Sequence, residues 1–328
     1  MVIRAGRNIL RVLMAIFLII ALVIIGFRVA ASFREVQTAD AAAPATGRFV
    51  TTAKGRIFVS LTGPLQGKPV VLIHGSGAWG GLWTETSNAL AKSGYRAIAL
   101  DLPPFGFSDR PSSHDYSRVA QADRILALVE AMKLNNPIIV GHSFGGGPAI
   151  EAVMRAPDRF AKVILVDPAL GIDAPISKPL LPLRSQAIRE GLVATAITNP
   201  LLTKRMLQTL IYRKDRAIPS YITILQQPLM RSGTTSAIAQ WLPYLLQNDP
   251  RALSGHGANY RALQVPVAII WGDKDTVTPL AQLKQLHGLV PSASVKLLHN
   301  TGHIPQVEDP DNFQRLLLNA LATNGSKR

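Results

Sequence analysis

The strongest constraint on the fold is a serine held where an apolar strand runs straight into a helix. Residues 137–140 are a short strand pattern, residues 140–146 read VGHSFGG, and a helical pattern starts at Gly145. A turn this tight strains the backbone, and side chains at positions 141 and 145 would clash with the neighbouring strand and helix, so both are glycine. The turn therefore pushes the hydroxyl of Ser143 out beyond the carboxyl end of a sheet.

From Phe49 onward, strand patterns alternate with helix patterns. The expected strands are 55–60, 69–73, 96–100, 137–140, 162–166, 267–271 and 295–298, and the helices between them include 84–92, 117–134 and 145–156. Continuous apolar strands separated by helices predict a mostly parallel sheet with helices on both faces. In such sheets ligands bind beyond the carboxyl ends of the strands.

Polar motifs stand at those strand ends, and together they carry a family resemblance. The motifs are His74-Gly75, the run DLPPFGFS at 101–108, the Ser143 turn, Gly272 to Asp275 and Gly302-His303. In this order, serine before acid before histidine, they resemble the α/β-hydrolase fold superfamily, in its esterase, epoxide hydrolase and haloperoxidase-like branch. The likeness covers residues 49–328 and implies an α/β-hydrolase fold with a helical cap.

The resemblance assigns a catalytic role to three side chains. Ser143 is expected to be the nucleophile, and His303, between Gly302 and Pro305, the base. Asp275 matches the position of the acid that orients the histidine. Asp273 in the same loop, and Asp167 after an earlier strand, where some relatives carry their acid, are the alternatives.

The same resemblance places an oxyanion hole beside the serine. The N–H of Phe144, at the start of the helix, is one expected donor. The second is the amide of Ser76, which follows His74-Gly75, with Gly77 as the alternative.

A mainly helical insertion, at about 169–263, interrupts the strand pattern and resembles the family's cap. Helical stretches are expected at 185–197, 201–212 and 236–246. Leu, Ile and Met dominate its apolar positions, which indicates a hydrophobic acyl or alcohol moiety in the substrate. The same apolar residues would be needed to pack the cap onto the body, whatever ligand the protein binds. Its basic residues fit either contact with a membrane surface or a solvated face.

The amino-terminal segment is predicted to be a transmembrane signal anchor at residues 1–33, followed by a flexible linker at 34–48. Arg4, Arg7 and Arg11 precede an uncharged apolar stretch at 12–27, which flanking apolar residues extend towards the length that spans a bilayer. Small residues near 29–31 and 39–41 leave a cleaved signal peptide as the alternative. The arginines favour a cytoplasmic amino terminus, which places the catalytic domain outside the cytoplasm.

Composition excludes several other classes of protein. The chain has 328 residues, no cysteine and a formal net charge of +15. Its basic residues are scattered and accompany no nucleic-acid-binding motif, so we expect no nucleic-acid partner. Neither metal-ligand spacing nor a nucleotide-binding loop is present, so we expect no cofactor. The sequence does not indicate an oligomeric state.

These features predict a membrane-tethered serine hydrolase that cleaves a carboxylic ester, with an amide less favoured, through an acyl-enzyme. Serine at position 143, where dehalogenases and epoxide hydrolases carry aspartate, disfavours alkyl-enzyme chemistry. Two alternatives use the same triad: a carbon–carbon bond hydrolase and a cofactor-free haloperoxidase-like enzyme. Carbon–carbon bond hydrolases usually carry glycine-proline after the His-Gly-Ser-Gly loop, where this chain has Ala78-Trp79. From another class, a non-catalytic ligand-binding protein with this fold is the remaining alternative.

Overall fold

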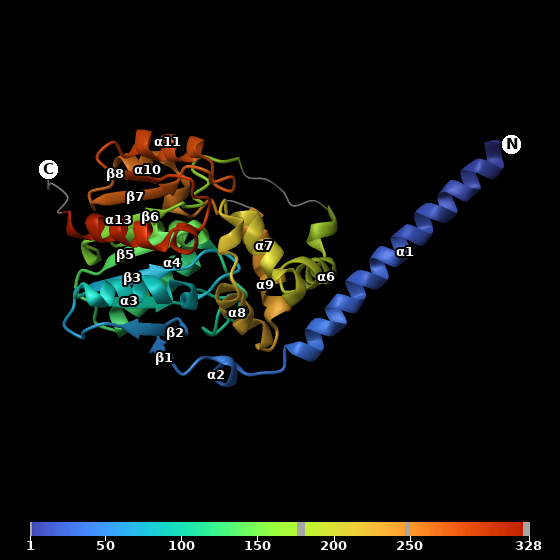
Figure 1. Ribbon diagram of the computed structural model, residues 1–328, viewed down its shortest axis with the longest axis horizontal. Helices are drawn as coiled ribbons and strands as arrows, with labels where there is room; N and C mark the ends of the chain where they lie inside the picture. Colours follow the sequence, from blue (N-terminus) through green and yellow to red (C-terminus); the bar gives the residue numbers. More distant parts are fainter. Residues whose placement is uncertain (1, 176–180, 247–248, 324–328) are drawn as a thin grey trace.

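The computed structural model describes residues 2–175, 181–246 and 249–323, which form a sheet of eight strands flanked by helices (Figure 1). The strand order is β1-β2-β4-β3-β5-β6-β7-β8. Strands β3 to β8 pair in parallel, whereas β1 and β2 pair antiparallel with each other, and β2 with β4. The predicted α/β-hydrolase fold with a mostly parallel sheet is confirmed.

The bounds of the elements follow the expected alternation. The strands are β1 Gly47–Thr52, β2 Gly55–Thr62, β3 Pro69–Ile73, β4 Arg96–Leu100, β5 Ile138–His142, β6 Lys162–Val166, β7 Val267–Gly272 and β8 Ser294–Leu298. The helices of the body are α3 Thr84–Lys92, α4 Arg118–Ala131, α5 Gly146–Arg155, α10 Gly257–Arg261, α11 Leu280–Leu289, α12 Pro305–Glu308 and α13 Pro310–Ala322.

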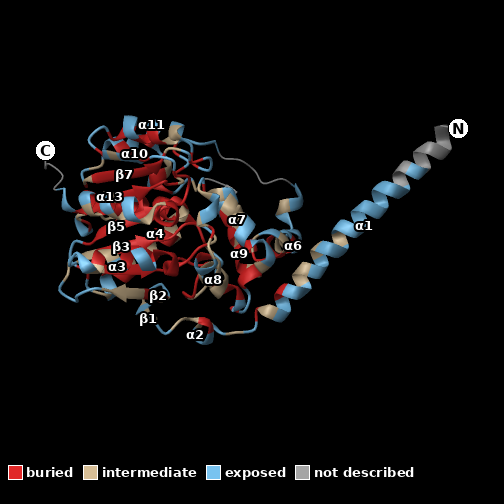
Figure 2. Ribbon diagram, in the orientation of Figure 1, coloured by how far each residue is buried: buried red, intermediate tan, exposed pale blue. Residues whose placement is uncertain are grey.

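Helices cover both faces of the sheet because successive residues of each buried strand point to opposite sides. In β3, Val71 and Ile73 pack with helices α4, α5 and α11. Val70 and Leu72 pack on the other face with α3 and α13. Figure 2 shows the central strands as the most deeply buried part of the molecule.

The cap lies between β6 and β7, over the carboxyl ends of the strands. Its helices are α6 Gln186–Ala196, α7 Thr203–Leu210, α8 Pro219–Gln226 and α9 Thr234–Leu246. The predicted stretch 201–212 is divided into a short 3-10 turn, η5 Pro200–Leu202, and α7, and α8 was not predicted. Residues 176–180 and 247–248 of the predicted cap, and 324–328 of the predicted body, lie outside the described residues.

Helix α1 Val2–Arg34 projects away from the rest of the molecule (Figure 1). Its segment Arg11–Arg34 is long and apolar enough to cross a membrane, a property that signal sequences share. The carboxyl-terminal part of α1 packs against α6 of the cap. There the Nε of Arg28 donates to Glu190 at 3.0 Å, and Ala31 is completely buried.

The segment predicted as a flexible linker, 34–48, is held against the cap and the body. The N–H of Gln37 donates to the carbonyl of Met230 at 3.0 Å, and the N–H of Ser232 donates to the carbonyl of Gln37 at 2.7 Å. A short helix, α2 Ala39–Ala42, follows, and β1 begins at Gly47, inside the predicted linker. Backbone hydrogen bonds to the cap therefore hold this segment in place. The alanine-rich composition of the segment does not indicate them.

Candidate active site

The turn between β5 and α5 presents Ser143 as the sequence predicted. Ser143 has a φ of 49°, the left-handed region that side chains other than glycine rarely adopt. A Cβ on Gly141 would lie 2.7 Å from the carbonyl oxygen of Gly145, and a Cβ on Gly145 would lie 2.5 Å from the carbonyl oxygen of His74. Only glycine fits these two positions, so the local backbone depends on both.

Ser143, His303 and Asp275 form a continuous hydrogen-bonded relay. The Oγ of Ser143 lies 2.7 Å from Nε2 of His303, and Nδ1 of His303 lies 2.8 Å from Oδ2 of Asp275. All three residues are buried. With the proton on Nδ1, the imidazole can accept the serine proton at Nε2, as a general base requires.

The carboxylate of Asp275 is held by its own loop. The N–H groups of Val277 and Thr278 donate to its Oδ1 at 2.7 and 3.0 Å, and the hydroxyl of Thr278 donates to Oδ2 at 2.6 Å. Burial opposes ionisation, but the hydrogen bond and charge of His303, with the bonds from Thr278, outweigh it and keep the pKa of Asp275 below its usual value. Asp275 is therefore an ionised partner for the histidine.

The two alternative acids lie elsewhere in the site. Asp273 has its Oδ2 3.2 Å from Nδ1 of His299, an exposed histidine. Asp167 is fully buried, and its Oδ1 accepts the N–H of Gly272 at 2.9 Å. Burial, reinforced by the charge of Asp275, raises the pKa of Asp167 well above its usual value, so it is a neutral neighbour of the relay.

Two buried side chains that sequence reasoning missed hold the His303 loop. The Nε2 of His142 donates to the carbonyl oxygen of His303 at 2.7 Å. Burial, with the nearby charge of His303, lowers the pKa of His142 to about 3, which keeps it neutral. Glu308 accepts the N–H groups of Gly302 and Ile304 at 2.9 and 3.2 Å.

Glu308 also joins this loop to the cap. Its Oε2 accepts the N–H of Tyr212 at 2.7 Å, just beyond the end of α7. The N–H of His303 donates to the carbonyl oxygen of Leu210 in α7 at 3.1 Å. The cap therefore helps to position His303, which no local sequence motif reveals.

The loops after β3 and β4 are fixed by hydrogen bonds to buried polar side chains. The Nε2 of His74 accepts the N–H of Leu102 at 3.0 Å, and burial lowers the pKa of His74 to about 4. Asp101 accepts the N–H groups of Gly80 and Phe107 at 2.7 and 2.8 Å. These bonds shape the strand ends around Ser143.

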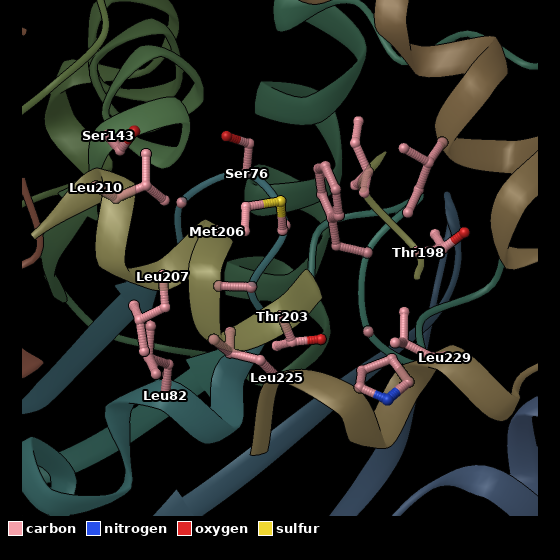
Figure 3. Close-up of a pocket in the computed structure, with 18 of the residues that line it drawn as sticks. Ser76, Leu82, Ser143, Thr198, Thr203, Met206, Leu207, Leu210, Leu225 and Leu229 are labelled. Carbon is pink, nitrogen blue, oxygen red and sulfur yellow. The ribbon is translucent and has the colours of Figure 1, made fainter. Parts of the chain in front are cut away.

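A cavity of about 120 Å³ lies between these strand ends and the cap. The residues that line it include Ser143, His303, Ser76 and Gly77. Figure 3 shows Leu82, Leu207, Leu210 and Leu225 gathered on one side of this cavity. The wall is mainly apolar, which suits a hydrophobic substrate moiety.

The oxyanion hole expected at Ser76 and Phe144 stays a prediction. Ser76 lines the cavity that Ser143 enters (Figure 3), as its role requires. The ring of Phe144 packs against Phe105 and Trp241, with ring centroids 6.0 and 5.4 Å apart. This packing holds the start of the helix in place.

The part of the chain that the structure describes holds no group of three or more histidine, cysteine and acidic side chains suited to a metal ion.

The sheet order, the cap and the serine–histidine–aspartate relay define a hydrolase of the α/β class. A family model for the alpha/beta hydrolase fold matches residues 68–310, and the chain belongs to this family.

Known proteins of this class resemble the chain over most of its length. A 2-hydroxymuconate semialdehyde hydrolase of Pseudomonas sp. (strain CF600) is 29% identical over 85% of this chain and 95% of its own length. Lipase 1 of Psychrobacter immobilis is 29% identical over 80% of each chain. The solved structure of a meta-cleavage product hydrolase from Pseudomonas fluorescens IP01 has a TM-score of 0.67 at 26% identity and covers 84% of this chain and 97% of its own. That of a membrane phospholipase A has the same TM-score at 21% identity and covers 96% of each, a likeness of fold.

Proposed function

We propose that the protein is a membrane-tethered serine hydrolase that cleaves a carboxylic ester through an acyl-enzyme. The observation that carries the proposal is the relay of Ser143, His303 and Asp275, of which Ser143 and His303 line a mainly apolar cavity. Similarity to a protein named as a lipase supports ester cleavage.

The relay suits the proton transfers of that reaction. The Oγ of Ser143 attacks the ester carbonyl carbon while its proton passes to Nε2 of His303, 2.7 Å away. The carbonyl oxygen becomes an oxyanion that the amides of Ser76 and Phe144 would stabilise. His303 then gives its proton to the leaving alcohol. Water, deprotonated by the same histidine, attacks the acyl-enzyme, releases the acid and restores Ser143.

Labelling by a fluorophosphonate probe tests the nucleophile in the full-length protein. We expect wild type to label and to hydrolyse p-nitrophenyl butyrate, and Ser143→Ala to do neither. Ser87→Ala, a buried serine of α3 outside the cavity, is a matched control that should label normally. Equal labelling of wild type and Ser143→Ala would remove the proposal and leave a ligand-binding role for the fold.

A second candidate is cleavage of a carbon–carbon bond on the same triad. It is favoured by the similarity to a 2-hydroxymuconate semialdehyde hydrolase, whereas Ala78-Trp79 after the His-Gly-Ser-Gly loop disfavours it. The two candidates are separated by kcat/KM on p-nitrophenyl butyrate and on 2-hydroxymuconate semialdehyde. Faster turnover of the semialdehyde, lost in Ser143→Ala, would replace ester cleavage with the second candidate.

Helix α1 supports the tether, because its segment Arg11–Arg34 has the length and hydropathy of a membrane span. The full-length protein expressed in a bacterial host should stay in the membrane pellet after carbonate extraction at high pH. A protease added outside spheroplasts should digest the catalytic domain. Release by carbonate would contradict the tether, and protection from the protease would reverse the proposed orientation.

A further inference from the structure

A guanidinium without a carboxylate partner lies in the wall of the active-site cavity. Arg110 lines the cavity together with Ser143. Its Nε donates to the carbonyl of Pro104 at 3.2 Å, its Nη1 to the carbonyl of Ser232 at 2.6 Å and its Nη2 to the hydroxyl of Thr234 at 2.8 Å. All three acceptors are uncharged, and Arg110 forms no ion pair with the residues that the structure describes. A guanidinium has five N–H donors, so two remain for another acceptor.

Arg110 belongs to the end of the cavity away from the nucleophile. The hydroxyl of Thr234, which accepts from Arg110, lies 3.2 Å from the carbonyl oxygen of Pro228. Pro228 and the adjacent Leu229 line the cavity, and Figure 3 shows Leu229 and Ser143 on opposite sides of it. A substrate that reached from Ser143 across the cavity to Leu229 would therefore approach Arg110.

A second cation, Arg231, adds positive charge next to Arg110, although it does not itself line the cavity. Arg231 is 6% exposed, and its Nη1 donates to the carbonyl of Gly106 at 2.9 Å. In the described part of the chain it has no ion-pair partner either. Burial, followed by the charge of Arg231, lowers the pKa of Arg110 to about 9, so Arg110 stays protonated at neutral pH.

The carboxylates that face the two arginines are engaged elsewhere. Asp109 binds Arg56 through both oxygens, and Glu35 pairs with Arg34 at 3.3 Å. Burial raises the pKa of Asp101 to about 7, so that carboxyl carries only part of a negative charge near neutral pH. Arg110 is half-buried and Arg231 is buried, and an anion in the cavity beside Arg110 would offset part of the cost of holding these two positive charges together.

We propose that Arg110 binds an anionic group, a carboxylate or a phosphate, that the substrate carries at the end remote from its scissile ester. The proposal rests on the proposed hydrolysis at Ser143. Leucines of the cap line the cavity between the two ends, which suits an apolar spacer. A planar guanidinium with free donors matches the two oxygens of a carboxylate or a phosphate.

Matched esters test the proposal in the full-length protein in detergent. The neutral substrate is methyl p-nitrophenyl adipate, and its anionic partners are mono-p-nitrophenyl adipate and p-nitrophenyl 6-phosphonooxyhexanoate. We expect wild type to prefer at least one anionic ester in kcat/KM by about tenfold or more, the size of one hydrogen bond between charged groups. The partner with the larger ratio identifies carboxylate or phosphate as the natural group.

Variants separate charge recognition from a structural role of Arg110. Arg110→Gln should abolish the preference while keeping turnover of the neutral ester, and Arg110→Lys should keep a smaller preference. Arg124→Gln is the control, because Arg124 is also buried and bonded to neutral oxygens but does not line the cavity. An equal loss on neutral and anionic esters in Arg110→Gln would make Arg110 a structural clamp and overturn the proposal.

A binding measurement keeps this proposal distinct from the hydrolysis itself. In Ser143→Ala, hexanoate or hexyl phosphate should raise the melting temperature, and the added substitution Arg110→Gln should remove the increase. No increase with either anion, together with no anionic preference in wild type, would overturn the anion site while hydrolysis of the neutral ester stood. An increase in the melting temperature of Ser143→Ala, together with no turnover of any ester by wild type, would support the anion site and contradict the proposed hydrolysis.

Discussion

Two carboxylates in the loop after β7 have different partners and should have different effects on catalysis. Asp275 is bonded to His303, whereas Asp273 is bonded to exposed His299. Asp275→Asn should lower kcat on the order of ten-thousand-fold, because an amide favours the wrong tautomer of the histidine and cannot stabilise the imidazolium. Asp273→Asn should leave kcat within about twofold of wild type by the same triad reasoning. Esterase assays at neutral pH measure both, and a severe loss in Asp273→Asn would contradict the assignment of the acid.

Asp167 is a buried carboxyl whose ionisation should make the protein less stable as pH rises. Its pKa is raised mainly by burial and next by the negative charge of Asp275. The folded chain therefore keeps the proton over a pH range, starting at about 4, in which the unfolded chain has lost it. Stability falls as pH rises from about 4 towards the higher folded-state pKa, because the unfolded state binds fewer protons there.

Asp167→Asn removes this ionisation and keeps an oxygen that can accept the N–H of Gly272. The melting temperature of Asp167→Asn minus that of wild type, both measured in detergent, should therefore be larger at pH 8 than at pH 5. An Asp167→Asn difference that is equal at pH 5 and pH 8 would show that Asp167 ionises as readily in the folded protein as in the unfolded chain.

At the scale of elements, the junction of β5 and α5 should tolerate no added methyl group. In Gly145→Ala the new Cβ would meet the backbone carbonyl of His74 at 2.5 Å and the side chain of Ile73 at 2.7 Å. The strand ends must move apart, so we expect a loss of about 1–3 kcal/mol in the free energy of unfolding, with reduced kcat. Gly288→Ala in α11 is the matched control, since nothing lies within 4 Å of its Cβ. That helical substitution should be neutral or stabilise by about 0.5–1 kcal/mol. Thermal melts of both variants provide the comparison.

The elements differ in how far local sequence determines them. Strands β3, β4 and β6 begin and end where the sequence predicts, because a strand buried on both faces is a continuous apolar run between polar or glycine-rich segments. Helix α8 was missed, since it is only eight residues long and begins at Pro219, and short turns in the proline-punctuated stretch around it also have proline at their first or second position. In the cap, contacts with the body decide where a helix ends.

The residues of the candidate site also differ in how far local sequence predicts them. The three triad positions stand in local motifs at strand ends, so the sequence predicts them. Glu308 and Arg110 could not be assigned in this way, because their partners come from the cap, far away in sequence. An acidic or basic residue carries no local sign that folding will bury it.

At the scale of the whole molecule, helix α1 is attached to the cap rather than to the sheet. Glu35, at the end of α1, accepts the N–H of Thr235 in α9 at 3.0 Å and is also bonded to the hydroxyl of Thr235. The cap in turn bonds to the loop of His303 through Leu210 and Tyr212. One chain of contacts therefore runs from the predicted membrane segment to His303, the proposed catalytic base.

The hydroxyl of Thr235 should control how firmly α1 is held. Thr235→Val keeps the shape of the side chain but removes two hydrogen bonds, one to the hydroxyl of Thr198 within the cap and one to the buried carboxylate of Glu35. The bond to the carboxylate is worth about 1.5–3 kcal/mol. The end of α1 should then open more often, and trypsin should cleave after Arg34 roughly tenfold faster or more, since cleavage of a locally opened segment follows its open population. Thr209→Val, whose hydroxyl bonds only to the carbonyl of Met206 on an exposed face of α7, should cleave like wild type. Neither change alters the sequence at the cleavage site, so mass spectrometry of the fragments compares opening alone. Unchanged cleavage in Thr235→Val would mean that the apolar contact of α1 with α6, and not the buried carboxylate, holds the helix on the cap.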